Sequence, residues 1–172
     1  LTQLAKKDDW KTFLVAYLPQ PDILLQCYYL QARLRSEPTL TAAELEQAKD
    51  LWLVGHSQPS TCDPVFAYLD TQKALTEDLY RQRIRLAIQR GNVPLTNYLA
   101  KQLPKSDQAW ISLWQGMYKH PEMTMKTFKE QDAPLAREIL LYGLKRLARK
   151  DADGAYNYWE TYRKQYAFTI EE

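Results

Sequence analysis

Two cysteines and two histidines are the residues of this 172-residue chain best suited to metal binding or redox chemistry. Cys27 and Cys62 stand 35 positions apart, and the chain has no Cys-x-x-Cys pair of the kind found in zinc sites and redox motifs. His56 and His120 each adjoin Gly or Pro and have no second His or Cys at the spacing of metal ligands. The sequence therefore predicts no metal site and no cofactor site, with both histidines solvated in loops.

Acidic residues form a second set with chemical potential, because two carboxylates can act as acid and base in glycoside cleavage. Glu44 and the pair Glu77-Asp78 instead fit the first turn of a helix, where negative charge interacts favourably with the helix dipole. We therefore interpret these carboxylates as helix-stabilising groups. The acidic residues of this set are Asp8, Asp9, Glu44, Glu46, Asp50, Glu77, Asp78, Asp151 and Asp153.

Aromatic residues near the end of the chain form a helical stripe of Tyr158, Trp159, Tyr162 and Tyr166. Such a stripe could stack against sugar rings, but its spacing also matches the buried face of a helix. We favour core packing and place Tyr166 on the same helix as the other three.

Basic residues follow one another in the segment 80–90, but Arg81, Arg83, Arg85 and Arg90 do not all share one helix face. A solvated surface is the expected role, and an acidic partner is the alternative. The sequence contains no nucleophile elbow, P-loop or dinucleotide-binding glycine motif. The residues alone thus favour a binding or structural scaffold over an enzyme, with no catalytic residue assigned.

Composition sets limits on the class of protein. Apolar residues make up 45% and charged residues 26%, which is sufficient for a folded core. The net charge of +2 is spread along the chain and does not indicate a nucleic-acid partner. No run of about 18 apolar residues is present that would indicate a transmembrane helix.

Helical periodicity of the apolar residues runs through almost the whole chain and predicts an all-α fold without a sheet. Asp22 and Thr41 are the expected N-caps of two early helices, and Thr41 with Glu44 matches a capping box. Gly55 stands where a left-handed residue would end the second of these helices, and Ser106 is the expected N-cap of a later one. The helical stripes span 23–34, 45–52, 80–88, 95–103, 110–117, 123–128, 136–147 and 155–166.

Connections between these stripes are mostly short, so consecutive helices are expected to pack as antiparallel hairpins. Helix pairs recur at intervals of roughly 30 to 45 residues, which is typical of a helical solenoid. We therefore expect one all-helical superhelix segment over residues 1–172.

Residues 47–66, QAKDLWLVGHSQPSTCDPVF, resemble a signature of the soluble lytic murein transglycosylases. The segments QCYYLQA at 26–32 and YRQRIRLAIQRGN at 80–92 are similar to two helices of the same family. The similarity is specific over 26–66 and 80–103. Over 105–172 it rests on helical pattern and spacing.

The resemblance implies a periplasmic protein related to enzymes that cleave the β-1,4 bond between N-acetylmuramic acid and N-acetylglucosamine of peptidoglycan and leave 1,6-anhydro ends. In that family a catalytic Glu lies in a Glu-Ser motif of a C-terminal lysozyme-like domain, preceded by a superhelix of hairpins that curls into a ring. The present chain has no Glu-Ser dipeptide, so the catalytic residue maps onto none of its positions. The resemblance therefore implies a non-catalytic superhelix, with glycan strands and the lysozyme-like domain as its partners.

The family also implies a disulfide between Cys27 and Cys62. The periplasm is oxidising, so such a pair is expected to close there. A loop of this size would be stabilised by about 4 kcal/mol on the loop-entropy model. Two free buried thiols are the alternative.

Two functions stay open at this point. The first is the architectural domain of a murein transglycosylase, and the second is a helical-repeat scaffold that binds a protein unrelated to the cell wall. The pattern of Thr169 and Glu172 matches another capping box, and Leu1, Leu4 and Ala5 begin a helical pattern without a cap. These ends predict that the chain is a fragment that continues as more helix.

Overall fold

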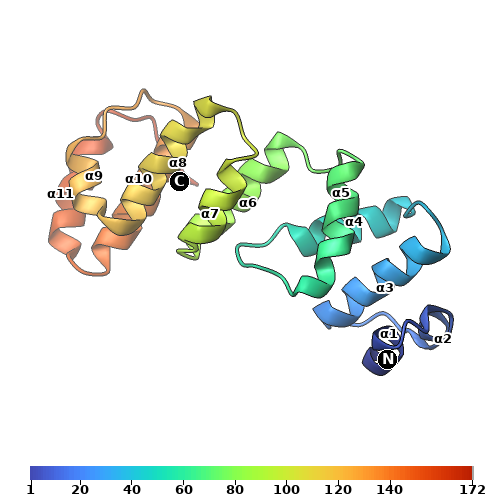
Figure 1. Cartoon of the computed structure of the whole chain (residues 1–172). Helices are drawn as coiled ribbons and strands as arrows, with labels where there is room; N and C mark the ends of the chain where they lie inside the picture. Colours follow the sequence, from blue (N-terminus) through green and yellow to red (C-terminus); the bar gives the residue numbers. More distant parts are fainter. Residues whose placement is uncertain (172) are drawn as a thin grey trace. The chain divides into compact units, whose positions relative to one another are not determined.

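The computed structural model describes residues 1–171, and every regular element in that range is a helix (Figure 1). The expectation of an all-α fold is confirmed. The chain divides into two compact units, Leu1–Leu86 and Ala87–Glu172. The expectation of one continuous superhelix segment over 1–172 stays a prediction, and the Thr169–Glu172 capping box includes a residue outside the described range.

Helices α1 to α5 and most of α6 form the first unit. Their bounds are α1 Thr2–Lys6, α2 Trp10–Ala16, α3 Ile23–Ser36, α4 Ala42–Trp52, the short 3-10 turn η1 Ser60–Cys62, α5 Asp63–Thr71 and α6 Glu77–Gln89. Helices α1 and α2 pack on α3 through a core of Ala5, Phe13 and Ala32. Tyr17 stacks on Tyr29 with ring centroids 4.5 Å apart, which extends this core to the side of α3.

The second unit contains the end of α6 and helices α7 to α11. Their bounds are α7 Val93–Ala100, the 3-10 turn η2 Lys105–Asp107, α8 Gln108–Lys119, α9 Pro121–Lys126, α10 Pro134–Ala148 and α11 Ala152–Tyr162. Helix α10 packs against α8, α9 and α11, and the buried side chains of Trp114, Met117, Ile139 and Leu140 lie at its contacts.

Side-chain caps begin the early helices as predicted. The Asp22 carboxylate accepts a hydrogen bond from the Leu25 amide at 2.9 Å. Thr41 and Glu44 form the full capping box, in which each side chain binds the other residue's backbone amide. These local signals were sufficient to place the starts of α3 and α4.

Five helix-end predictions are wrong. Two predicted stripes, 95–103 and 123–128, extend beyond the observed ends of α7 at Ala100 and α9 at Lys126. Gly55 does not adopt the left-handed region, and α4 ends at Trp52 with Leu53 as its C-cap. Ser106 lies inside η2, and Asp107 is the N-cap of α8. The last helix ends at Tyr162, so Tyr166 lies beyond it.

Helix α5 was not predicted at all. Its start is fixed by Pro64 in the first turn directly after Cys62, and Val65 and Leu69 are its buried residues. Two buried positions in nine residues are too few for periodicity alone to identify a helix.

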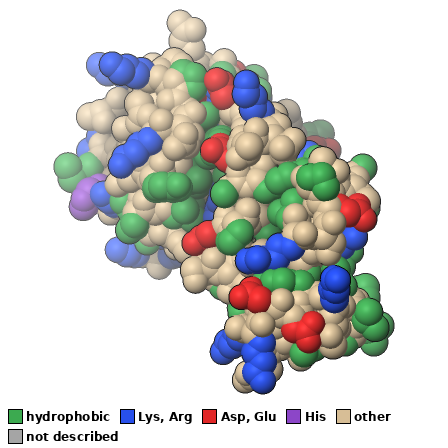
Figure 2. Space-filling view, turned by 45° about the vertical axis from the view of Figure 1, so that its right-hand side comes forward, with side chains coloured by type: hydrophobic (Ala, Val, Ile, Leu, Met, Phe, Trp, Pro, Cys, Tyr) green, Lys and Arg blue, Asp and Glu red, His purple; other side chains and the backbone are tan. Residues whose placement is uncertain are grey.

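Charged and apolar groups share the surface. On the face shown in Figure 2, Lys and Arg side chains are interspersed with Asp, Glu and hydrophobic ones. Among residues 1–171, the helices lack the length and apolar character that crossing a lipid bilayer requires.

Gly91 provides a test of packing in the second unit, because it has a φ of +72° and lies against the ring of Tyr118. A Cβ at this position would lie 2.0 Å from the Tyr118 hydroxyl oxygen. Gly91→Ala should lower the free energy of unfolding by roughly 2 kcal/mol, because steric overlap adds to a left-handed backbone cost of about 1 kcal/mol. Urea denaturation followed by circular dichroism measures this change.

Tyr118→Ala in the Gly91→Ala background is the control. Removing the ring should leave only the backbone cost, so the double variant should lose less stability than the sum of the two single variants. A change below about 0.5 kcal/mol for Gly91→Ala would contradict the close approach.

Candidate functional site

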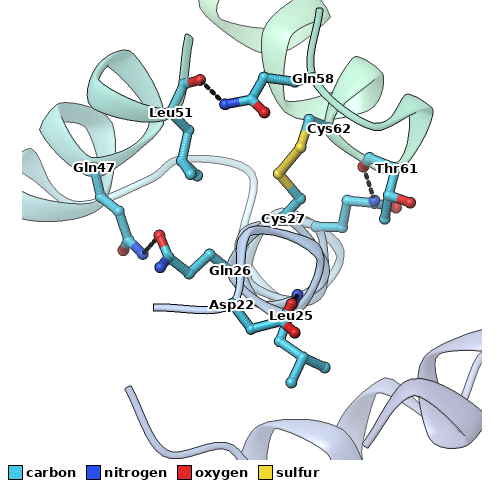
Figure 3. Close-up of a disulfide and its surroundings, with 10 residues drawn as sticks. Asp22, Leu25, Gln26, Cys27, Gln47, Leu51, Gln58, Thr61 and Cys62 are labelled. Atoms are coloured by element: carbon cyan, nitrogen blue, oxygen red, sulfur yellow. Dashed lines mark hydrogen bonds between the residues drawn. A yellow bond between two sulfur atoms is a disulfide. The ribbon is translucent and has the colours of Figure 1, made fainter. Parts of the chain in front are cut away.

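The two cysteines meet in the first unit and form a disulfide (Figure 3). Cys27 comes from the first turns of α3 and Cys62 ends η1, and their Sγ atoms are 2.00 Å apart with Cα atoms at 5.0 Å. Both residues are fully buried. The bond therefore links α3 to the start of α5 across the connection that follows α4.

Glutamine side chains bind the backbone around this disulfide. Gln58 donates a hydrogen bond from its side-chain amide to the Leu51 carbonyl at 2.7 Å, and Gln31 donates one to the Thr61 carbonyl. Figure 3 shows Gln58 and Leu51 on one side of the sulfur bridge and Thr61 on the other. The connection between α4 and α5 is thus fixed by side chains at both of its ends.

Arg83 holds the middle of the same connection. Its guanidinium donates hydrogen bonds to the carbonyls of Val54 and His56 at 3.1 and 3.4 Å, and it lies 4.4 Å from the ring centroid of Trp52. Arg83 is 5% exposed, so the expectation of a solvated arginine is wrong at this position. Burial is tolerated because two carbonyls and an aromatic face replace water around the charge.

Glu44 is the other buried charged residue of the first unit. Its Oε1 accepts hydrogen bonds from the Tyr29 hydroxyl at 2.8 Å and from Arg33 Nε at 2.6 Å. Its Oε2 accepts from the amide and the hydroxyl of Thr41, both at 2.9 Å. The predicted first-turn role is confirmed, and the carboxylate also ties α4 to α3.

These hydrogen bonds shift the pKa values of Glu44 and Tyr29. Burial alone would raise the pKa of Glu44, but hydrogen bonds from Thr41, Tyr29 and Arg33 lower it to about 2. Burial, together with the hydrogen bond to Glu44, raises the pKa of Tyr29 to about 12. A carboxylate held in its ionised form by four donors is suited to structure and not to proton transfer.

The remaining acids and the histidines are not brought together. Glu77 pairs with Arg81 at 2.8 Å, and Asp78 accepts from Gln82 at 2.7 Å, so both support the first turn of α6. His56 and His120 are exposed. Within residues 1–171, no group of three His, Cys, Asp or Glu residues is placed to hold a metal ion.

The C-terminal aromatic stripe lies mostly in the core. The Tyr162 hydroxyl donates to the Met125 carbonyl at 2.6 Å, and the Tyr166 hydroxyl donates to the Glu130 carbonyl at 2.5 Å. Tyr162 and Tyr166 are buried, and the rings of both lie 6.1 Å from that of Phe128. Tyr158 and Trp159 are half-buried. The packing interpretation fits this arrangement better than a sugar platform.

Sequence reasoning missed the most elaborate part of this site, the binding of the α4–α5 connection by Arg83 and Gln58. Neither residue has a local signal, because its backbone partner lies 29 residues away for Arg83 and 7 for Gln58. What the geometry offers is a covalent and hydrogen-bonded join between helices.

Comparison with known proteins identifies relatives of this chain. The chain is 29% identical over 157 residues to the soluble lytic murein transglycosylase of Escherichia coli K12 and 31% identical to that of Salmonella typhimurium. Each alignment covers 90% of this chain and 24% of the relative.

Solved structures agree with this assignment. An inactive mutant of the lytic transglycosylase Slt from Pseudomonas aeruginosa aligns with 98% of this chain at a TM-score of 0.79 and 30% identity. The chain is a homologue of part of the soluble lytic murein transglycosylases. The 70-kDa soluble lytic transglycosylase in complex with bulgecin A aligns at a TM-score of 0.73 and 26% identity. The transglycosylase neighbours match through helical superhelix domains, which confirms the expected fold class.

The transglycosylase alignment is partial on the relatives' side. This chain spans about a quarter of the length of the curated relatives and of the solved structures that it matches. The activity of those longer proteins is therefore a matter of proposal for this chain.

A family model described as Cucumovirus coat protein matches residues 21–127. Viral capsid domains are commonly β-sheet jelly rolls, whereas residues 21–127 of this chain contain no strand. The transglycosylases named above align over nearly the whole chain. We therefore base the family assignment on the transglycosylases and draw no viral function from the coat-protein match.

Replacing both cysteines, Cys27→Ala with Cys62→Ala, should lower the free energy of unfolding by about 4 kcal/mol. The bond closes a loop of 35 residues and restricts the unfolded chain. Denaturant midpoints of the two proteins measure the difference. Intact mass after alkylation without reductant should show no alkylated thiol in the parent chain purified from a periplasm.

Reduced parent chain is the control for this comparison and should match the double variant. Equal midpoints for the oxidised parent and the double variant would contradict a stabilising disulfide, and two alkylated thiols would contradict its formation.

Glu44→Gln should remove a pH-dependent part of the stability. The pKa of Glu44 is lowered from 4.5 to about 2 on folding, so its contribution is complete above pH 5 and is lost as the pH falls towards 2. At about 1.4 kcal/mol per pKa unit, this contribution is roughly 3–4 kcal/mol. Urea titrations at pH 7, 5, 4 and 3 should show a shallower loss of stability for the variant than for the parent.

Glu46→Gln is the matched control, because Glu46 pairs with Lys49 on the exposed side of the same helix. Its stability should stay within about 0.5 kcal/mol of the parent at each pH. A parallel pH dependence of Glu44→Gln and the parent would show that the buried network does not hold the carboxylate ionised.

Proposed function

We propose that this chain is a non-catalytic helical domain of a lytic transglycosylase that acts on peptidoglycan in the periplasm. The observation that carries the proposal is the alignment of nearly the whole chain with about a quarter of known lytic transglycosylases. The sequence itself has no Glu-Ser dipeptide, the motif that carries the catalytic Glu in the family it resembles. The chain's own part in the reaction is then to support and position.

The internal construction of the first unit supports this role. The α4–α5 connection is held by a disulfide, by Arg83 and by Gln58. Each of these interactions restricts the backbone between two helices. Such a join suits a domain that must hold a fixed surface for a bound glycan strand or for a lysozyme-like catalytic domain.

The disulfide also supports the proposed compartment. Disulfides persist in oxidising environments such as the bacterial periplasm and are rare in the cytosol. A fully buried bond between α3 and η1 that closes a loop of 35 residues supports an oxidising compartment, and the periplasm is the compartment that we propose.

The role has two consequences that can be measured with purified sacculi. The isolated chain should release no 1,6-anhydro muropeptides, measured by liquid chromatography and mass spectrometry, because it supplies no acid or base to the glycosidic bond. It should nevertheless sediment with the sacculi, because the proposed domain offers a surface to glycan strands.

An active lytic transglycosylase serves as the positive control, and bovine serum albumin serves as the control for sedimentation. Anhydro products above the blank, from a preparation free of host enzymes, would refute the non-catalytic role. Failure to sediment above albumin would refute a glycan-binding surface and leave support of the catalytic domain as the role.

A further inference from the structure

One end of the second unit carries a concentration of basic side chains. It is formed where helices α6, α8 and α10 end, at Gln89, Lys119 and Ala148. We call these side chains the basic end; they are Arg90, Lys119, Lys145, Arg146, Arg149 and Lys150. All of them are exposed or half-buried.

Contacts within the unit bring the three helix ends together. Arg146 lies 4.0 Å from the ring centroid of Tyr118, and its Nε donates to the Tyr118 carbonyl, which joins α10 to α8. The Tyr142 hydroxyl donates to the Ile88 carbonyl at 3.3 Å, which joins α10 to α6. Gly91 lies directly against the Tyr118 ring. The basic residues of three helices are thus neighbours in space.

Near its C-terminal end, helix α10 presents its basic side chains on a single face. Tyr142, Lys145, Arg146 and Arg149 follow the spacing i, i+3, i+4 and i+7, which places them on one side of a helix. Leu147 lies on the other side and is buried in the core. Burial raises the pKa of Tyr142, and the positive charges of Arg146 and Arg149 oppose part of this rise.

Carboxylates do not neutralise this surface. Elsewhere in the unit, Lys126 pairs with Glu122 and Arg163 with Glu160, each within 2.6 Å. Across the described part of the chain, no ion pair is formed by the residues of the basic end. The neighbouring acid, Asp151, is engaged as the N-cap of α11, where it accepts from the Gly154 amide at 2.9 Å.

Helix dipoles explain only part of this charge. A cation near a helix C-terminus contributes about 0.3–1 kcal/mol, and Arg146 already serves α8 through its bond to the Tyr118 carbonyl. The formal net charge of the whole chain is only +2, so the rest of the molecule is on balance acidic. Concentrating unpaired cations at one end costs repulsion, which a bound anion would relieve.

We propose that the basic end is a docking surface for an acidic polypeptide segment in an extended conformation. Lys145 and Arg149 are separated by one helical turn, a rise of about 6 Å. Alternate side chains of an extended peptide repeat at about 7 Å on one side, so carboxylates at i and i+2 match this spacing. Arg149 and Arg90 can each bind a carboxylate through two parallel hydrogen bonds.

The surroundings favour a peptide over a lipid surface. Helices that bind membranes combine basic residues with exposed apolar ones that enter the bilayer. The large exposed apolar side chains of the described residues are Leu1, Val15, Leu18, Ile23, Tyr98, Met123, Tyr156 and Ile170. None of them lies on α10 or in the segments 88–91 and 118–120.

Binding of fluorescein-labelled hexaglutamate tests the proposal by fluorescence anisotropy in 20 mM and 200 mM NaCl. The parent chain should bind at low salt and lose at least tenfold in affinity at high salt. Lys145→Glu with Arg149→Glu and Lys150→Glu should reduce the low-salt affinity at least tenfold. The charge-neutral form, with Gln at the same three positions, should show an intermediate loss.

The matched control reverses the same number of exposed lysines elsewhere, with Lys11→Glu, Lys101→Glu and Lys105→Glu. It changes the net charge nearly equally and should keep the parent affinity within about twofold. Circular dichroism and thermal midpoints establish that every variant is folded; if the Glu form unfolds, the Gln form carries the comparison.

Three results would overturn the proposal. The first is no binding of hexaglutamate by the parent at low salt, and the second is an equal loss in the two charge-reversal variants. The third is tighter binding to vesicles with 30% phosphatidylglycerol or to a ten-residue oligothymidylate, since either would assign the surface to phosphate. None of these results bears on the release of anhydro muropeptides, so the proposed function is tested separately.

Discussion

The covalent link between α3 and the start of α5 is the constraint on which the first unit depends. In the sequence, helix α4 lies between these two elements. The connection that follows α4, residues 53–62, has no regular structure before η1. Without the bond, this connection would be ordered only by the burial of Val65 and Leu69 on α5 and by the hydrogen bonds of Gln31, Gln58 and Arg83. With it, the far end of the connection is fixed, and Gln58 and Arg83 need only bind carbonyls already close to them.

The buried charges of the first unit also join its helices. Glu44 and Arg33 form an ion pair that is largely removed from water, and such pairs gain stability only when every remaining donor and acceptor is satisfied. Here Thr41 and Tyr29 supply the remaining donors to Glu44, while Glu37 accepts from Arg33 at 3.3 Å. The ion pair is specific to this arrangement of helices, because Arg33 lies on α3 and Glu44 lies on α4. It therefore fixes how α4 lies on α3, which in turn sets where the α4–α5 connection begins.

The sequence predicted the parts of the fold that depend on neighbouring residues. The caps at Asp22 and Thr41 are read from three or four residues, and their geometry follows from backbone amides that every helix leaves unpaired. The helix ends were predicted less well. Gly55 was expected to be left-handed, but the tertiary contacts of Val54 and His56 with Arg83 determine the path there. The pairing of Cys27 with Cys62 came from family resemblance, because no local rule connects residues 35 positions apart.

Long side chains that bind carbonyls near helix ends explain why a chain with so few glycines can make its turns. A helix leaves its last four carbonyls without intrahelical partners, and a glycine-based cap is one way to satisfy them. This chain repeatedly uses another way, in which a Tyr or Arg from a later helix donates to a carbonyl in the last turn of a helix or just beyond it. The pairs are Arg83 with Val54, Tyr142 with Ile88, Arg146 with Tyr118, and Tyr162 with Met125.

Three of these bonds join residues 28 to 37 positions apart, roughly the length of a helical hairpin, and the Tyr142–Ile88 bond joins residues 54 positions apart. Each bond therefore links helices that are distant in the sequence. The tyrosine and arginine content of the chain is then a structural requirement of short, glycine-poor connections. It also explains why an aromatic stripe that could suit sugar stacking is used for packing, because a Tyr ring that fills the core carries its hydroxyl to a carbonyl at the edge. A Tyr162→Phe chain would keep the ring and lose the hydroxyl donor, so the Met125 carbonyl would still accept from the Phe128 amide but would lose its hydrogen bond from α11. The loss of this buried link between α11 and α9 is what makes tyrosine rather than phenylalanine the residue required there.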